Sequence, residues 1–68
     1  MSDNALVRMA NEIALSFGAH GEDEAITETA RHISRFWEPR MRLELKQLLA
    51  DGRAEGLSAV AAKAMEQV

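Results

Sequence analysis

Apolar residues recur every three or four positions along most of the chain, which is the spacing of one face of an α-helix. The first such stripe, with its flanking apolar residues, consists of Leu6, Met9, Ala10, Ile13, Ala14 and Phe17. Gly18 and Gly21 follow it, and either can adopt the positive φ that ends a helix. We therefore expect a first helix over residues 3–18, N-capped by Ser2 or Asp3.

A second stripe consists of Ile26, Ala30, Ile33 and Trp37, with Thr29 and Phe36 beside it. Three acidic residues at positions 22–24 precede it, and negative charge interacts favourably with the free N–H groups of a helix N-terminus. Pro39 interrupts the pattern because it lacks an N–H and disfavours helical geometry at Glu38. We expect a second helix over residues 22–37, followed by a proline corner.

The second half of the chain predicts two further helices. Pro39 is well placed as the first residue of a helix over residues 39–51, whose stripe is Met41, Leu45 and Leu48 with Leu49 adjacent. Gly52 is its candidate C-cap. Ser58 can N-cap a short Ala-rich helix over residues 59–67, which either docks or frays. The prediction is an all-α bundle of three main helices plus a short C-terminal one, a single domain over residues 1–68.

The size of the chain predicts a partner. A chain of 68 residues buries only about 60 % of its unfolded surface, so its core is marginal. It contains no Cys, which excludes disulfides and thiolate metal sites. Small domains without such staples are usually stabilised by association. We expect either a second copy of the chain or a larger protein as the partner.

Positive charge is concentrated in the middle of a chain whose net charge is −3. Residues 31–46 hold Arg31, Arg35, Arg40, Arg42 and Lys46 against two glutamates. The negative total argues against a general nucleic-acid binder, whereas a local basic region suits an acidic protein surface. Two i,i+4 acids, Glu38 and Glu44, can occupy Arg42 and Arg40. Arg31 and Arg35 lack such an acid, and Glu28 can offset Arg31 only at i,i+3. Arg31 and Arg35 are therefore the better candidates for partner contact, unless they form only a solvated face.

Several large apolar residues lie off the expected stripes or next to the corner. Leu15 and Leu43 point away from their stripes, either as tolerated surface residues or as partner contacts. Phe36 and Trp37 offer large contact areas, although Trp37 can instead belong entirely to the core. The candidate partner-binding residues are Leu15, Arg31, Arg35, Phe36, Trp37, Arg40, Arg42 and Leu43.

The sequence contains no phosphate-binding loop, zinc-protease motif or nucleophile elbow. Two histidines, His20 and His32, are too few for a metal cage without help from carboxylates, and His32 is expected at the rim of the second helix. Apolar runs are far shorter than the ~20 residues that span a membrane. We expect no secretory signal, since the first residues lack a basic region followed by an apolar run. We expect a cytoplasmic, non-enzymatic chain that binds neither cofactor nor membrane. A small helical nucleic-acid-binding module and a self-associating bundle are the alternatives.

Two segments carry a family resemblance. Residues 7–13 read VRMANEI, and residues 32–41 read HISRFWEPRM. Gly56-Leu57-Ser58 is similar to the closing element of the same family. Together these motifs resemble the small delta subunit of soluble, NAD-dependent, molybdenum-containing formate dehydrogenases. Glu12, where the family pattern has an amide, is a small departure.

The resemblance implies a place in a multi-subunit enzyme. The alpha subunit would carry the molybdenum bis-molybdopterin guanine dinucleotide and iron–sulfur clusters, while the beta and gamma subunits would carry FMN and pass electrons to NAD. The delta subunit would hold no redox cofactor. It would bind the alpha subunit and support assembly, stability or insertion of the molybdenum cofactor. The alternative is a transient insertion chaperone that is absent from the mature enzyme.

Overall fold

The structure of the chain is a computed structural model that describes the backbone of residues 3–68 and the side chains of residues 5–68. The helices in this range are α1 (Asp3–Ser16), α2 (Glu22–Phe36), α3 (Pro39–Ala50) and α4 (Ala59–Met65), with a short 3₁₀ helix η1 (Gly18–His20). Residues 3–68 contain no strand, so the predicted all-α fold is confirmed. The proposed N-cap side chains of Ser2 and Asp3 lie outside the described side chains.

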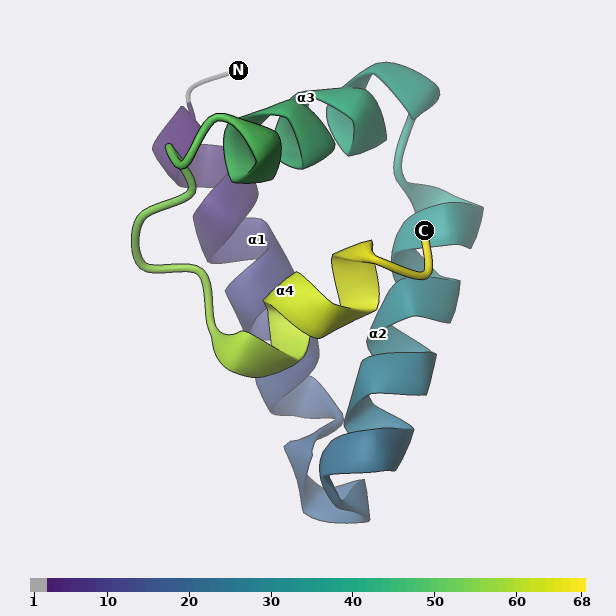
Figure 1. Ribbon diagram of the computed structural model, residues 1–68. Helices are drawn as coiled ribbons and strands as arrows, with labels where there is room; N and C mark the ends of the chain where they lie inside the picture. The colour runs from purple at the N-terminus through teal and green to yellow at the C-terminus, as the bar shows by residue number, and fades with distance from the viewer. Residues whose placement is uncertain (1–2) are drawn as a thin grey trace.

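The helices are arranged around a central core (Figure 1). α1 and α2 run in opposite directions and are joined by η1 at one end of the pair. α3 crosses the other end, and α4 lies across the front, packed against α2, α1 and α3. The C-terminal segment is therefore docked, which was one of its two expected states.

Local hydrogen bonds explain where the helices end. α1 stops at Ser16, earlier than expected, and the Ser16 hydroxyl donates to the Ile13 carbonyl at 2.7 Å. α3 ends in a Schellman motif, because the Gly52 N–H donates to the Leu49 carbonyl and the Arg53 N–H to the Leu48 carbonyl. Gly52 has φ +70°, as its predicted capping role requires. α4 ends at Met65 instead of residue 67, where i→i+3 bonds tighten the last turn.

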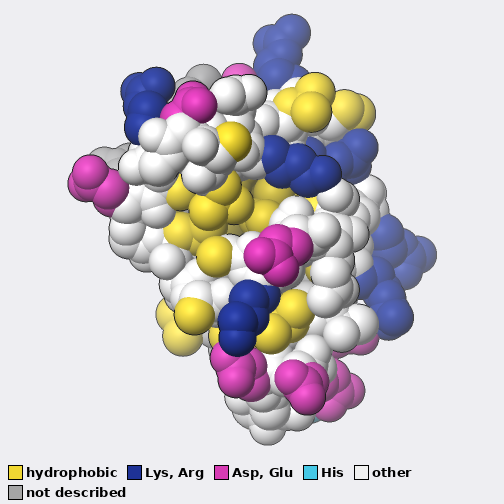
Figure 2. Space-filling view, viewed as in Figure 1, with side chains coloured by type: hydrophobic (Ala, Val, Ile, Leu, Met, Phe, Trp, Pro, Cys, Tyr) yellow, Lys and Arg dark blue, Asp and Glu magenta, His cyan; other side chains and the backbone are white. Residues whose placement is uncertain are grey.

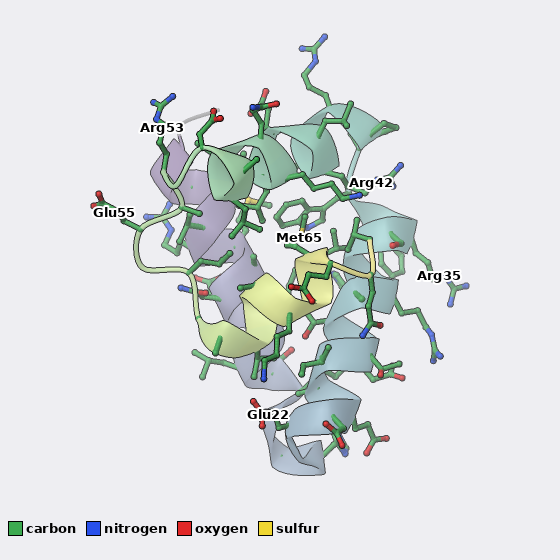
Figure 3. The ribbon with its side chains drawn as sticks, in the orientation of Figure 1. Glu22, Arg35, Arg42, Arg53, Glu55 and Met65 are labelled. Carbon is green, nitrogen blue, oxygen red and sulfur yellow. The ribbon has the colours of Figure 1, made fainter. Side chains whose placement is uncertain are left out.

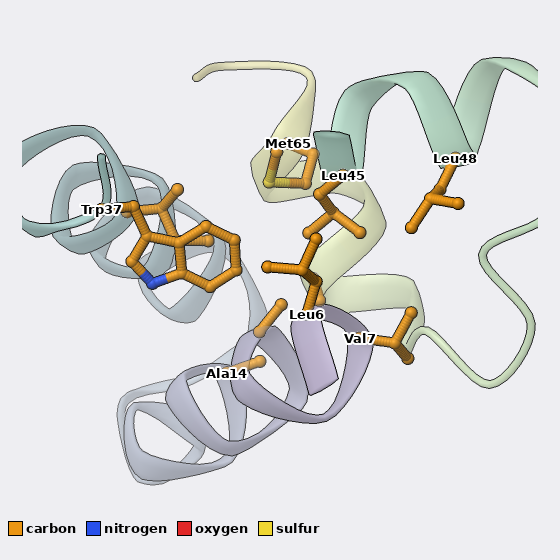
Figure 4. Packing of buried hydrophobic residues seen from close by; sticks show 10 residues of the cluster. Leu6, Val7, Ala14, Trp37, Leu45, Leu48 and Met65 are labelled. Carbon is orange, nitrogen blue, oxygen red and sulfur yellow. The ribbon is translucent and has the colours of Figure 1, made fainter. Parts of the chain in front are cut away.

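The proline corner forms as predicted. Trp37 and Glu38 are extended, with ψ of 143° and 148°, and Pro39 begins α3. The indole of Trp37 points into the core between α1, α3 and α4 (Figure 4). The buried cluster around it consists of Leu6, Val7, Ala10, Ala14, Ile33, Trp37, Leu45, Leu48, Ala61 and Met65.

The buried face of α1 differs from the predicted stripe. Val7, which lies outside that stripe, is buried, whereas Ile13 and Phe17 are only half-buried. Ala14, a flanking member of the stripe, is buried as expected. Val7, Asn11 and Ala14 lie on the side of α1 that faces residues 55–60, since they line hollows together with that segment. Because residues 55–60 pack on this side, the buried face of α1 is turned toward them and away from Ile13 and Phe17.

No helix in residues 3–68 combines the length and the apolar character that crossing a membrane requires. Within the same range, no group of three or more His, Cys, Asp or Glu side chains is placed to hold a metal ion.

Candidate partner-binding surface

The predicted apolar outliers reach solvent. Leu15 is 79 %, Phe36 70 % and Leu43 66 % exposed, whereas Trp37 is only 6 % exposed. Of the two roles considered for Trp37, the folded chain places it in the core. Leu15 and Phe36 line different hollows, so the structure does not bring them into one patch.

One hollow lies on the outer side of α2 and is called here the α2 hollow. It is lined by Phe17, Glu28, Arg31, His32, Arg35 and Phe36. Glu28, His32 and Arg35 share one helical face through their i,i+4 and i,i+7 spacing. The turn after α1 adds Phe17 from the neighbouring segment. The hollow thus combines charged and aromatic side chains on one outer face.

His32 lies between two phenylalanine rings. Its ring centroid is 6.5 Å from that of Phe17, at an interplanar angle of 62°, and 4.8 Å from that of Phe36, at 46°. Such edge and tilted contacts are favourable for aromatic pairs. His32 is half-buried, in agreement with its expected rim position. The stack positions the exposed ring of Phe36 on the surface.

Arg31 is engaged inside its own helix. Its Nη1 donates to Glu28 Oε1 at 2.9 Å, an i,i+3 ion pair. This is the i,i+3 contact that the sequence allowed for Arg31 in the absence of an i,i+4 acid. Arg35 forms no hydrogen bond or ion pair within the part of the chain that the structure describes. Its side chain extends away from the bundle (Figure 3).

Arg42 has an internal role that the sequence did not predict. Its Nη1 donates to the carbonyl oxygens of Ser34 at 2.8 Å and Trp37 at 3.1 Å, at the end of α2. A cation is favourable there, because the last carbonyls of a helix carry partial negative charge. The expected Glu38–Arg42 and Arg40–Glu44 ion pairs do not form among residues 5–68.

These contacts change which arginines are available to a partner. Arg42 is hydrogen-bonded to carbonyls at the end of α2, and Arg31 forms an ion pair with Glu28. Arg35 and Arg40 have no ionic partner among the described side chains. Figure 2 shows Lys and Arg side chains along the edge of the molecule formed by α2, and hydrophobic side chains gathered between α3 and α4. Among the four arginines of residues 31–42, the two without an ionic partner in the described part of the chain are thus Arg35 on α2 and Arg40 at the start of α3.

Sequence reasoning missed Phe17 and His32 as parts of this surface. The i,i+4 spacing of Glu28, His32 and Phe36 could have indicated a shared face on α2. The contact with Phe17 had no such signal, because it depends on how η1 folds back against α2.

A family model described as the NADH-dependent formate dehydrogenase delta subunit FdsD matches residues 5–65. No curated protein and no solved structure matches the chain. The matched range runs from α1 to the last residue of α4 and includes both motifs on which the resemblance rests. The chain belongs to the family of delta subunits of NADH-dependent formate dehydrogenases.

Proposed function

We propose that the chain is a non-catalytic accessory subunit that binds the molybdenum-containing alpha subunit of a formate dehydrogenase. In that role it supports assembly and stability of the complex or insertion of the molybdenum cofactor. The observation that carries this proposal is the family match over residues 5–65. Redox chemistry would belong to the cofactors of the other subunits, and the residues of this chain would bind and orient protein surfaces.

The described surface supports a docking role. Leu15, Phe36 and Leu43 are large apolar side chains that face solvent, and single domains of this size gain stability from covering such residues. Arg35 and Arg40 add guanidinium groups without ionic partners in residues 5–68, and planar guanidinium groups match carboxylates well. Trp37 packs in the core, and Arg42 donates a hydrogen bond to the Trp37 carbonyl. Both residues thereby stabilise the corner between α2 and α3.

The test is purification of the complex through a tagged copy of this chain. Cells able to make the molybdenum cofactor are compared with cells that cannot make it. An accessory subunit co-purifies in constant proportion with active enzyme, and deletion of the chain lowers formate oxidation. A transient chaperone would be recovered only with cofactor-free alpha subunit. Absence of any formate dehydrogenase subunit from the purified material, with unchanged activity after deletion, would contradict the proposal.

A further inference from the structure

The α2 hollow carries one positive charge in excess. It contains two guanidinium groups, Arg31 and Arg35, and one carboxylate, Glu28. The 2.9 Å contact between Glu28 and Arg31 neutralises one of the guanidiniums. Arg35 is left without an ionic partner among residues 5–68, on a chain whose net charge is −3. The unmatched charge in the hollow is therefore a single fork-shaped donor, which suits one carboxylate.

An apolar contact site adjoins this charge. Phe36 follows Arg35 in the chain and is 70 % exposed, although its ring packs 4.8 Å from that of His32. Because the stack already restricts this ring, covering it with a partner side chain requires little further loss of side-chain freedom. Arginine is also one of the types that most often dominate binding energy at protein interfaces, and phenylalanine is enriched at interfaces relative to the rest of the surface.

We propose that the α2 hollow is a docking site for a protein segment that presents one carboxylate beside an apolar side chain. The inference rests on the proposed function in taking that segment from a formate dehydrogenase subunit. The carboxylate pairs with Arg35, and the apolar side chain covers Phe36. Charge complementarity selects this hollow over the one lined by Leu15, which contains no charged side chain.

The same charges disfavour a polyphosphate or nucleic acid as the occupant. Binding of nucleic acid relies on several phosphate contacts, whereas this hollow offers a single unpaired guanidinium. Glu28 also lies in the hollow and would repel a multiply charged phosphate chain. A single carboxylate meets less of this repulsion.

Binding of variants to formate dehydrogenase purified without this chain provides the first test. Arg35→Glu and Phe36→Ser are each expected to weaken binding about tenfold or more, as central interface residues do. Arg35→Lys keeps the charge but loses the fork, so it should weaken binding less. The matched control is Lys46→Glu, an exposed charge reversal on α3. This control should bind as the wild type does.

Photo-crosslinking identifies the occupant. Phe36→p-benzoylphenylalanine is expected to cross-link to a formate dehydrogenase subunit, at a peptide with Asp or Glu within about three residues of the linked position, since neighbouring side chains contact one surface. The same photoreactive residue at position 46, which is exposed on α3, is the control and should give no such product.

The outcomes separate this inference from the proposed function. Wild-type-like binding by Arg35→Glu and Phe36→Ser would place the docking face elsewhere and overturn the inference, while binding of the wild type would keep the proposed function. A cross-link to nucleic acid, or to a peptide without acidic residues, would overturn the assigned occupant. Failure of the wild-type chain to bind any formate dehydrogenase subunit would overturn both. Circular dichroism melting of each variant checks that the exposed substitutions leave the fold intact.

Discussion

The side-chain amide of Asn11 holds the backbone of Ser58 at the entrance of α4. Asn11 Oδ1 accepts a hydrogen bond from the Ser58 N–H at 2.8 Å, and Asn11 Nδ2 donates to the Gly56 carbonyl at 2.9 Å. Ser58 in turn caps α4, since its hydroxyl accepts from the Ala61 N–H at 3.2 Å. The contact joins the VRMANEI and Gly-Leu-Ser segments, which are distant in the sequence. Both segments therefore help to fix the position of the start of α4.

Asn11→Ala is expected to lower the free energy of unfolding by about 2 kcal/mol, because it removes two hydrogen bonds worth about 1 kcal/mol each. Urea unfolding measures the change, and hydrogen exchange should show lost protection in residues 59–65. The control is Glu12→Ala, an exposed neighbour on α1. Equal stability of the two variants would show that the Asn11 contact does not hold α4 in place.

Arg42→Ala is expected to destabilise the chain by about 1–3 kcal/mol, the range for hydrogen bonds made by a charged group. The physical reason is that the Ser34 and Trp37 carbonyls lose their shared donor at the corner. Arg40→Ala, on the same helix but exposed, should change stability by less than about 0.5 kcal/mol. Thermal unfolding of the two variants checks the difference, and similar melting temperatures would refute a capping role for Arg42.

Thr29→Val is expected to raise the free energy of unfolding by about 1 kcal/mol. Thr29 is fully buried, and its hydroxyl makes no hydrogen bond to any described residue. Valine has nearly the same shape and does not bury an unsatisfied polar atom. Thr27→Val is the contrasting variant, because the Thr27 hydroxyl is exposed and donates to the Asp23 carbonyl at 3.1 Å. A loss of stability in Thr29→Val would indicate that the hydroxyl is satisfied in solution.

Trp37→Ala is expected to cost about 3–5 kcal/mol, the usual range for truncating a buried aromatic residue. That amount is comparable to the total contribution expected from so small a core, about 3–5 kcal/mol, so the variant should be largely unfolded. Loss of partner binding by Trp37→Ala would therefore report unfolding and not a docking contact. Trp37→Phe should retain helical circular dichroism with a lowered melting temperature. A stable, folded Trp37→Ala chain would contradict the core assignment.

The helices themselves could be predicted because their signals are local. Apolar spacing, the proline at position 39 and the glycine at position 52 act through neighbours within a few residues, and all three gave elements that the structure confirms. The ends of α1 and α4 were less predictable. Each terminates in a tightened turn, whose formation depends on competition among nearby carbonyl acceptors.

The candidate surface could be predicted only in part. Exposure of Leu15 and Leu43 followed from helical spacing, since each lies opposite its stripe. The hydrogen-bond and ion-pair partners of the arginines did not follow from spacing. A long flexible side chain can bond an acceptor that is close in the fold but lies outside the i,i+4 pattern. Arg42 donates hydrogen bonds to the carbonyls at the end of α2 and does not pair with its i,i+4 acid, Glu38.

By itself the sequence determined that this chain is helical, where it turns and which family motifs it carries. The tertiary structure alone decided that α4 docks, which face of α1 is buried and which arginines are left for a partner. The physical reason is the range of the interactions involved. Helix formation and capping depend on residues close in the sequence, whereas the bonds from Asn11 to residues 56 and 58 and the contact between Phe17 and His32 exist only once separate helices have packed together.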